Sequence, residues 1–340
     1  MSTARNRLSP AIEPLVAAWL AEKQSDSTRR NYARALSAWR AFLAGHTVPT
    51  GSRPLDLWDA NADLVHSWQQ SMRDSELSVA TINHALSSVS SFYAYAIASH
   101  AAPAHLVRNP IGVDIRREAV DAFQGVQPLS IADYDQLLVH LEDHSNTLSG
   151  ARAHALLRTF LHTGWRVGPL LQMTWGAIRP SRSRHNGFIY TWTTPGGAVI
   201  NDILPADCNE AICHYLRLAN RAPESLASDA CVWTPIREPN ISGFGALLDP
   251  TRPICARTAL RILRTHLDAA GIAHADRYRL IDLRHTHALL LLESGASLPV
   301  IQERLQHSQR QTTTRYLRRT FRVQPADDPT QGFAALRTSR

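Results

Sequence analysis

Lysine is almost missing from this sequence of 340 residues, since Lys23 is the only one. The 36 basic residues are therefore nearly all arginines, whose guanidinium group stays protonated at physiological pH. A mechanism that needs a lysine as proton donor or nucleophile has none available after Lys23. With 29 acidic residues the formal charge is +7, a balance that suits a polyanionic partner.

Cysteines and long apolar runs are also scarce. The four cysteines lie far apart, and Cys208, Cys213 and His214 are as close as the sequence comes to a zinc-ligand set. Because no CxxC pair occurs, we expect reduced thiols, no metal and no cofactor. No apolar run approaches the roughly 20 residues of a membrane span, and the first residues lack the core of a signal peptide. The sequence thus predicts a cytoplasmic, nucleoid-associated protein without a membrane partner.

The apolar pattern divides the chain into two helical regions. Between residues 10 and 100, apolar residues recur with helical spacing in four segments, which predicts a compact four-helix module. Residues 101–127 mix proline, glycine and charge without a period, which is typical of a linker. We place the boundary near residue 120, giving a domain over residues 1–120 and a second over 121–340. The four expected helices cover Pro10 to Lys23, a segment capped by Asp26 or Ser27 and ended by Gly45, Ala60 to Met72, and a segment from Ser78.

Two helices of this module carry polar or basic side chains beside their apolar stripes. The second helix presents arginines, and the fourth presents small hydrogen-bonding residues. Such a surface can approach a DNA backbone closely, although a plain solvated helix face has the same composition. The candidate DNA contacts are Arg29, Arg30, Arg34, Asn83, His84 and Ser87.

The second region is again helical, with one clear β signal. Aromatic and β-branched residues on both sides of Pro195-Gly196-Gly197 predict a β-hairpin. Helices are expected from Ser130, over Ala151 to His162 and from Arg166, and the helix over Ala256 to Ala269 adds Arg257 and Arg261 as candidate DNA contacts. The fold class expected is therefore mainly α with a small β-hairpin in the C-terminal domain.

Four residues have the chemistry needed to break a DNA strand without metal or nucleotide. A tyrosine can attack the phosphodiester and keep the bond energy in a covalent intermediate. Arginines stabilise the charge that develops on the phosphate oxygens, and a histidine adds a further donor. Arg284, His307 and Tyr316 follow one another on short predicted helices, and Arg166 after Thr163-Gly164 is the candidate second arginine.

These segments resemble the tyrosine recombinase (phage integrase) family over roughly residues 10–320. The run LRHTHALLLLESGASLPVIQERLQHSQRQTTTRYLR is similar to the family's run from second arginine to nucleophile, and HTGWRVGPLLQMTW is similar to its first box. The resemblance implies a SAM-like N-terminal DNA-binding domain and a catalytic domain that form a C-shaped clamp. It also implies that Arg166, Arg284 and His307 hold the scissile phosphate while Tyr316 forms a 3′-phosphotyrosine bond.

Three positions depart from the family pattern. Ile281 stands where the family has a histidine or lysine, Pro169 stands where it commonly has an acidic residue, and the hairpin turn has no lysine to serve as general acid. The proton donor for the leaving 5′-hydroxyl therefore stays unassigned, and His287 and His185 are residues to test. His285 matches the family's Arg-His-Thr and is expected to be structural.

The leading hypothesis is a site-specific DNA recombinase that integrates, excises or resolves a mobile element. The partners implied are a double-stranded recombination site, a homo-tetramer on two sites with a dimer on each, and possible helper proteins. A C-terminal tail with Phe333 and Leu336 suits exchange between subunits. The alternatives are a catalytically degenerate relative that binds DNA as an accessory protein, and a topoisomerase-like relaxing enzyme.

Overall fold

The computed structural model describes residues 12–47, 53–106, 108–112, 115, 117, 126–181, 187–194, 196–236, 250–307, 313–314 and 317. The chain divides into two compact units, Met1–Ala122 and Phe123–Arg340. Among the described residues, no helix combines the length and apolar character that crossing a membrane requires. The predicted Tyr316, His185 and the tail with Phe333 and Leu336 lie outside these residues.

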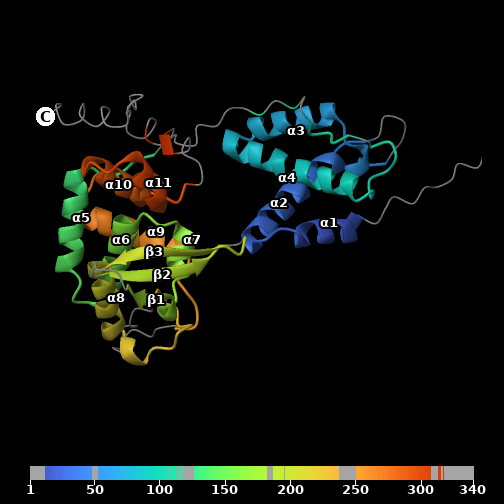
Figure 1. Ribbon diagram of the computed structural model, residues 1–340. Coiled ribbons are helices and arrows are strands. Elements are labelled where there is room, and N and C mark those ends of the chain that lie inside the picture. The colour runs from blue at the N-terminus through green and yellow to red at the C-terminus, as the bar shows by residue number, and fades with distance from the viewer. Residues whose placement is uncertain are drawn as a thin grey trace, which may run out of the picture. The chain divides into compact units, whose positions relative to one another are not determined.

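The N-terminal unit contains the four predicted helices, with α2 and α4 packed at its centre (Figure 1). Their bounds are α1 Ile12–Ala21, α2 Asp26–Ala44, α3 Ala62–Asp74 and α4 Val79–Ala98, with a 3-10 turn η1 at Leu57–Asp59. The helical spacing of apolar residues after Ser78 predicts that α4 buries Ile82, Leu86, Val89 and Phe92, and all four are buried. Helical spacing therefore located the core correctly in this helix.

Three local expectations for this unit were wrong. Ser25 caps α2, because its hydroxyl accepts a hydrogen bond from the backbone N–H of Thr28, so Asp26 already lies inside the helix. The helical spacing of apolar residues in α2 predicts that Tyr32 and Phe42 are buried, but both are half-buried at the edge of the core. The same spacing in α4 predicts Ser88 on the polar outer face, but Ser88 is buried and its hydroxyl donates to the carbonyl of His84.

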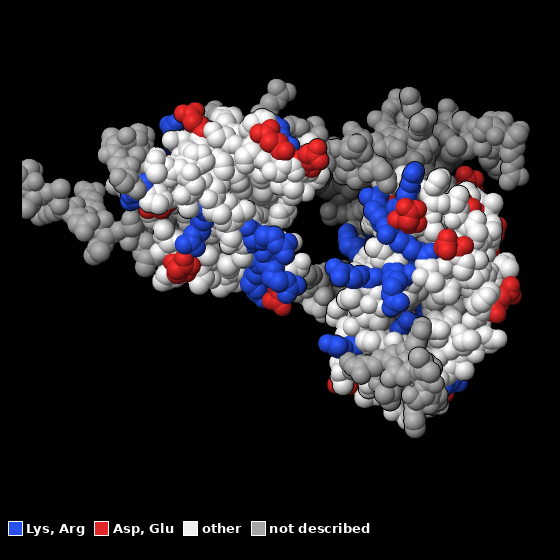
Figure 2. All heavy atoms as spheres, turned by 180° about the vertical axis from the view of Figure 1, so that it is seen from behind, with Lys and Arg blue, Asp and Glu red and all other residues white. Residues whose placement is uncertain are grey.

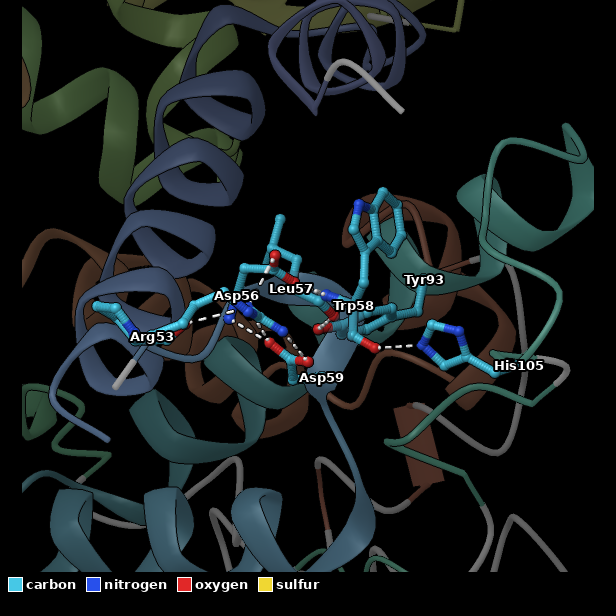
Figure 3. A network of polar contacts seen from close by, with 8 residues as sticks. Arg53, Asp56, Leu57, Trp58, Asp59, Tyr93 and His105 are labelled. Carbon is cyan, nitrogen blue, oxygen red and sulfur yellow. Dashed lines mark hydrogen bonds and ion pairs between the residues drawn. The ribbon is translucent and has the colours of Figure 1, made fainter. Parts of the chain in front are cut away.

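A polar network fixes the turn η1 against α4 (Figure 3). The Tyr93 hydroxyl donates to the Leu57 carbonyl at 2.8 Å and accepts from Trp39 Nε1 at 2.9 Å. Arg53 forms two hydrogen bonds to the Asp59 carboxylate, while Nε2 of His105 lies 2.9 Å from the Trp58 carbonyl. Burial raises the pKa of Tyr93, so the phenol stays protonated and keeps its donor.

The C-terminal unit is built around helix α6, which is buried along most of its length. Helices α5, α8, α9 and α10 and strand β3 all pack against α6. Figure 1 shows the helices α10 and α11 at one end of this unit and the sheet beside α6. The bounds are α5 Ile131–Asp143, α6 Leu148–Thr163, α7 Val167–Leu171, η2 Trp175–Ala177, α8 Ala206–Leu218, η3 Pro223–Ser225, α9 Ala256–Ala269, η4 Ala275–Arg277, α10 Leu280–Glu293 and α11 Leu298–Arg304.

The predicted hairpin is present and has one additional strand. β2 (Gly187–Thr193) and β3 (Val199–Pro205) pair antiparallel, and β1 (Ile178–Pro180) adds to β2, giving the order β1-β2-β3. The sequence pattern missed β1 because three residues are too few to show alternation. The fold class is thus mainly helical with a small antiparallel sheet, as predicted.

Candidate active site

Helix α6 ends at Gly164, and this turn begins the candidate site. Gly164 has φ +62°, a left-handed conformation that favours glycine. A Cβ atom added here would lie 2.5 Å from Cδ2 of His287 on α10. Both the backbone conformation and the close imidazole therefore require glycine, and the following residues Trp165 and Arg166 leave the helix in a fixed direction.

Arg284 on α10 joins this turn to the end of α11. Its guanidinium donates to the Gly164 carbonyl at 2.8 Å and also to the Leu305 carbonyl. The residue is only 5% exposed. The sequence predicted a phosphate contact for Arg284, and the structure shows in addition that it connects two chain segments.

Arg166 lies exposed at the start of α7 and reaches the same segment. Its guanidinium donates to the side-chain oxygen of Gln306 at 3.3 Å and to the backbone carbonyl of Gln306 at 3.2 Å. Arg284 and Arg166 therefore bind two successive residues, Leu305 and Gln306. Two guanidinium groups at adjacent carbonyls form a concentrated positive charge of the kind that stabilises a phosphate.

His307 follows directly and completes this cluster. Its Nδ1 lies 3.0 Å from the Thr313 hydroxyl, and its carbonyl accepts a hydrogen bond from Gln302. Burial, together with the nearby charges of Arg284 and Arg166, lowers the pKa of His307 to about 4. The imidazole is therefore neutral near pH 7 and can offer one N–H donor without adding charge. The structure thus brings Arg166, Arg284 and His307 together.

Two further residues at this site, Asp202 on β3 and Gln306, were not predicted from the sequence. One Asp202 carboxylate oxygen accepts from Trp165 Nε1 at 2.8 Å and from Gln306 Nε2 at 2.9 Å. No pattern in the sequence links these residues, because Asp202 and Gln306 are 104 positions apart. An acidic residue within a strand that is otherwise mostly apolar was the one signal available.

The histidines of α10 are poor proton donors. Nδ1 of His287 donates to the Leu161 carbonyl at 2.9 Å, so its Nε2 is the unprotonated nitrogen, and burial lowers the pKa of the ring to about 4. Burial also lowers the pKa of His285 to about 4. Ile281 is 40% exposed and offers no polar atom in its side chain. Among the described residues, these positions supply no replacement for the missing lysine.

The candidate DNA contacts differ in how available their charge is. Arg29 is engaged by Asp26 and by the carbonyl of Lys23, whereas Arg30 and Arg34 on the same helix are exposed. On α4, His84 is exposed and packs against Tyr32, while Asn83 and Ser87 are half-buried. Arg257 and Arg261 are both exposed on α9. Figure 2 shows Lys and Arg side chains gathered in a band on the C-terminal unit and in a cluster on the N-terminal unit.

A second group of ionisable residues lies between α6 and α8 and includes Cys208 from the zinc alternative. His162, Asp207 and Cys208 have ligand atoms within 4.8 Å of one another. Arg158 and His162, however, bind the same Asp207 oxygen at 3.0 and 2.9 Å, and both partners hold the pKa of that carboxyl well below its usual range. An arginine on the carboxylate disfavours a cation, so this group is an ion-pair network that joins two helices.

Two protein-family models match this chain. The model of the phage integrase family matches residues 129–322, and that of the phage integrase N-terminal SAM-like domain matches residues 15–100. The tyrosine recombinase XerD of Rickettsia conorii is 25% identical over 312 residues, covering 87% of this chain and 90% of that protein. XerD of Rickettsia bellii is 24% identical over 303 residues, with coverage of 87% and 90%.

Solved structures share the fold. The XerH site-specific recombinase bound to difH substrate, in a pre-cleavage complex, matches with a TM-score of 0.62 and 15% identity over 88% of this chain and 79% of that one. A lambda integrase dimer bound to a COC′ core site matches with a TM-score of 0.59 and 16% identity over 90% and 93%. The chain therefore belongs to the phage integrase family of tyrosine recombinases.

Proposed function

We propose that this protein is a site-specific DNA recombinase that cuts and rejoins strands through a 3′-phosphotyrosine intermediate on Tyr316. The observation that carries this proposal is that Arg284 and Arg166 bind the successive carbonyls of Leu305 and Gln306, directly before His307. Two guanidinium groups and a neutral imidazole donor suit a phosphodiester whose non-bridging oxygens gain charge during reaction.

The proposed reaction conserves atoms and bond energy. The Tyr316 oxygen attacks the scissile phosphorus, its proton leaves, and the bond from phosphorus to the 5′-oxygen breaks. The departing 5′-oxygen takes up a proton and leaves as a hydroxyl. Attack by the 5′-hydroxyl of another strand on the phosphotyrosine then restores a phosphodiester and frees Tyr316. No nucleotide triphosphate is consumed, because the covalent intermediate stores the bond energy.

DNA is the proposed partner of both units. The XerH and lambda integrase structures similar to this chain are described as bound to difH substrate and to a core site. The exposed arginines Arg30 and Arg34 on α2 and Arg257 and Arg261 on α9 provide cations for phosphate contacts. A dimer on each site and a tetramer on two sites complete the proposal, with the tail around Phe333 and Leu336 passing between subunits.

Capture of the covalent intermediate tests this function. The protein would be incubated with sheared DNA that carries its gene and both flanks, denatured in detergent, and recovered with any attached DNA for sequencing. We expect fragments ending at one position, lost in Tyr316→Phe and retained in Tyr95→Phe, which changes a half-buried tyrosine of α4. Specific binding of such fragments without a covalent adduct would contradict the proposed strand cleavage and favour an accessory DNA-binding protein.

A further inference from the structure

Asp202 contacts the two chain segments that carry Arg166 and His307. It lies on β3, and its side chain is 14% exposed. One carboxylate oxygen accepts from Trp165 and from Gln306, and the other accepts from the backbone N–H of Ile203 at 2.8 Å. Arg304 at the end of α11 lies 3.8 Å from that second oxygen. The carboxylate therefore joins the strand to two segments of the candidate site.

Each of these segments places an active residue. Trp165 directly precedes Arg166, and its ring packs on Tyr190 and Trp192 of β2 with centroid distances of 4.9 and 5.6 Å. Gln306 directly precedes His307 and accepts Arg166 on both its side-chain and backbone oxygens. Asp202 thus binds the residue before Arg166, which is Trp165, and the residue before His307, which is Gln306.

The backbone and the side chain of Gln306 are both held in one conformation by hydrogen bonds. Its φ is +50°, a left-handed value that non-glycine residues rarely adopt. Its backbone N–H donates to the Glu303 carbonyl at 2.8 Å, and its amide joins Asp202 to Arg166. These two hydrogen bonds fix the orientation of the Gln306 amide, since its nitrogen must face the Asp202 carboxylate and its oxygen must face the Arg166 guanidinium.

We propose that Asp202 and Gln306 are positioning residues that orient the Arg166 guanidinium for the scissile phosphate. This inference rests on the proposed function, because it assigns a role within that reaction. Pro169 has no carboxylate, and its carbonyl instead accepts the Tyr190 hydroxyl at 2.7 Å. Gln306 then supplies the two acceptors that hold Arg166, and Asp202 on β3 accepts from the Gln306 amide and so fixes its orientation.

The variants Asp202→Asn and Gln306→Leu test the proposal. An asparagine cannot accept from Trp165 and Gln306 with one atom while also accepting from the N–H of Ile203, because its other atom is an NH2 donor. Gln306→Leu removes both side-chain bonds and leaves the backbone carbonyl in place. Asp207→Asn is the matched control, because Asp207 also accepts from two side chains, Arg158 and His162, and among the described residues it forms no hydrogen bond to Arg166, Gln306 or Trp165.

Two measurements separate positioning from stability. The first is the single-turnover rate of adduct formation on the DNA fragment captured above, with DNA affinity measured in parallel. The second is the affinity for inorganic phosphate, followed by the NMR signal of the Trp165 indole N–H. Asp202→Asn and Gln306→Leu should each lower the rate and the phosphate affinity roughly tenfold, the factor of one hydrogen bond to a charged group, with little change in DNA affinity.

A double variant tests the positioning role further, and several results would contradict it. With Arg166→Ala as background, adding Asp202→Asn should change neither quantity further, because the group that Asp202 orients is already absent. Wild-type rate and phosphate affinity in Asp202→Asn and Gln306→Leu would overturn the inference, as would an equal loss in Asp207→Asn. If the wild type forms no adduct, the proposed function fails, and the phosphate titration still decides the positioning role. A wild type that neither forms an adduct nor responds to phosphate overturns both.

Discussion

At the scale of single residues, the hairpin turn has no lysine that could protonate a leaving group, and this absence has a consequence that can be measured. In the proposed reaction the leaving 5′-oxygen needs a proton, while burial keeps His285 and His287 neutral with pKa values of about 4. A DNA substrate with sulfur in place of this bridging oxygen releases a thiolate, which needs no proton to leave.

Sulfur substitution should therefore accelerate cleavage by this protein, because proton transfer to oxygen limits the reaction when a strong acid is missing. We expect at least about a tenfold higher rate of strand release, measured on matched oxygen and sulfur substrates in denaturing gels. Adding Tyr316→Phe should abolish release of both. Equal rates on oxygen and sulfur would show that an efficient acid is present, and a search for it would begin with the residues outside the described ranges.

Gly164 gives a second prediction at this scale. Gly164→Ala forces an alanine into a left-handed conformation and places its Cβ 2.5 Å from His287. We expect the free energy of unfolding to fall by about 2–5 kcal/mol, the sum of backbone strain and overpacking. Gly271→Ala is the control, since Gly271 has φ +76° but only Gln136 Nε2 nearby, at 3.5 Å. It should cost only about 1–2 kcal/mol in urea unfolding, and equal losses in both variants would remove the role assigned to His287.

At the scale of elements, the sequence located helices far better than it located the contacts between them. The stripe of α4 and the cap Ser130 of α5 are local patterns, so spacing and capping rules identified both. The Asp202 contacts to Trp165 and Gln306 depend on how β3 packs beside two distant turns. No local rule carries that information, which is why the three clustered residues were predicted and the residues that hold them were not.

The interface of α5 with α9 makes stability depend on pH. Nε2 of His140 lies 3.2 Å from Nδ1 of His266, and burial followed by the neighbouring histidines lowers the pKa of His266 to about 4. An unfolded histidine titrates near pH 6.5, so between about pH 6.5 and 4 the unfolded chain binds more protons than the folded chain. Stability from this group is complete above pH 6.5 and is lost as the pH falls toward 4.

His266→Gln should reduce this dependence. We expect the variant to take up about one proton fewer than the wild type on unfolding near pH 5, measured as the slope of unfolding free energy against pH. Buried His285 and His287 and half-buried His307, whose pKa values are also lowered to about 4, keep a remaining slope of the same sign. A variant with the wild-type slope would contradict the assignment to the interface of α5 and α9.

At the scale of the whole molecule, the basic charge should act through particular arginines and not as a uniform excess. Arg34 on α2 is exposed, whereas Arg29 on the same helix is held by Asp26 and by the carbonyl of Lys23. Each phosphate neutralised releases counterions, which adds about 0.9 to the slope of log affinity against log salt concentration. The two arginines therefore provide a matched pair.

Arg34→Ala should lower that slope by about 0.9 on a random-sequence duplex, and Arg29→Ala should lower it by less. Filter binding at several salt concentrations measures both slopes. A larger loss in Arg29→Ala would show that the ion pair with Asp26 opens when DNA binds. No loss in either would place the DNA contact of this unit elsewhere, with His84 on α4 as the next residue to substitute.

Lys23 has one further consequence, which concerns the handling of the protein. Its ammonium donates to Ser91 at 3.3 Å and lies 5.4 and 5.5 Å from the ring centres of Trp19 and Tyr32. Amine-reactive reagents have no other lysine to modify in the chain. A dye or surface coupled under native conditions should therefore attach mainly at the terminal amine, and labelling of Lys23 should follow the opening of α1 from α4. One side chain thus reports on one helix without any engineered substitution.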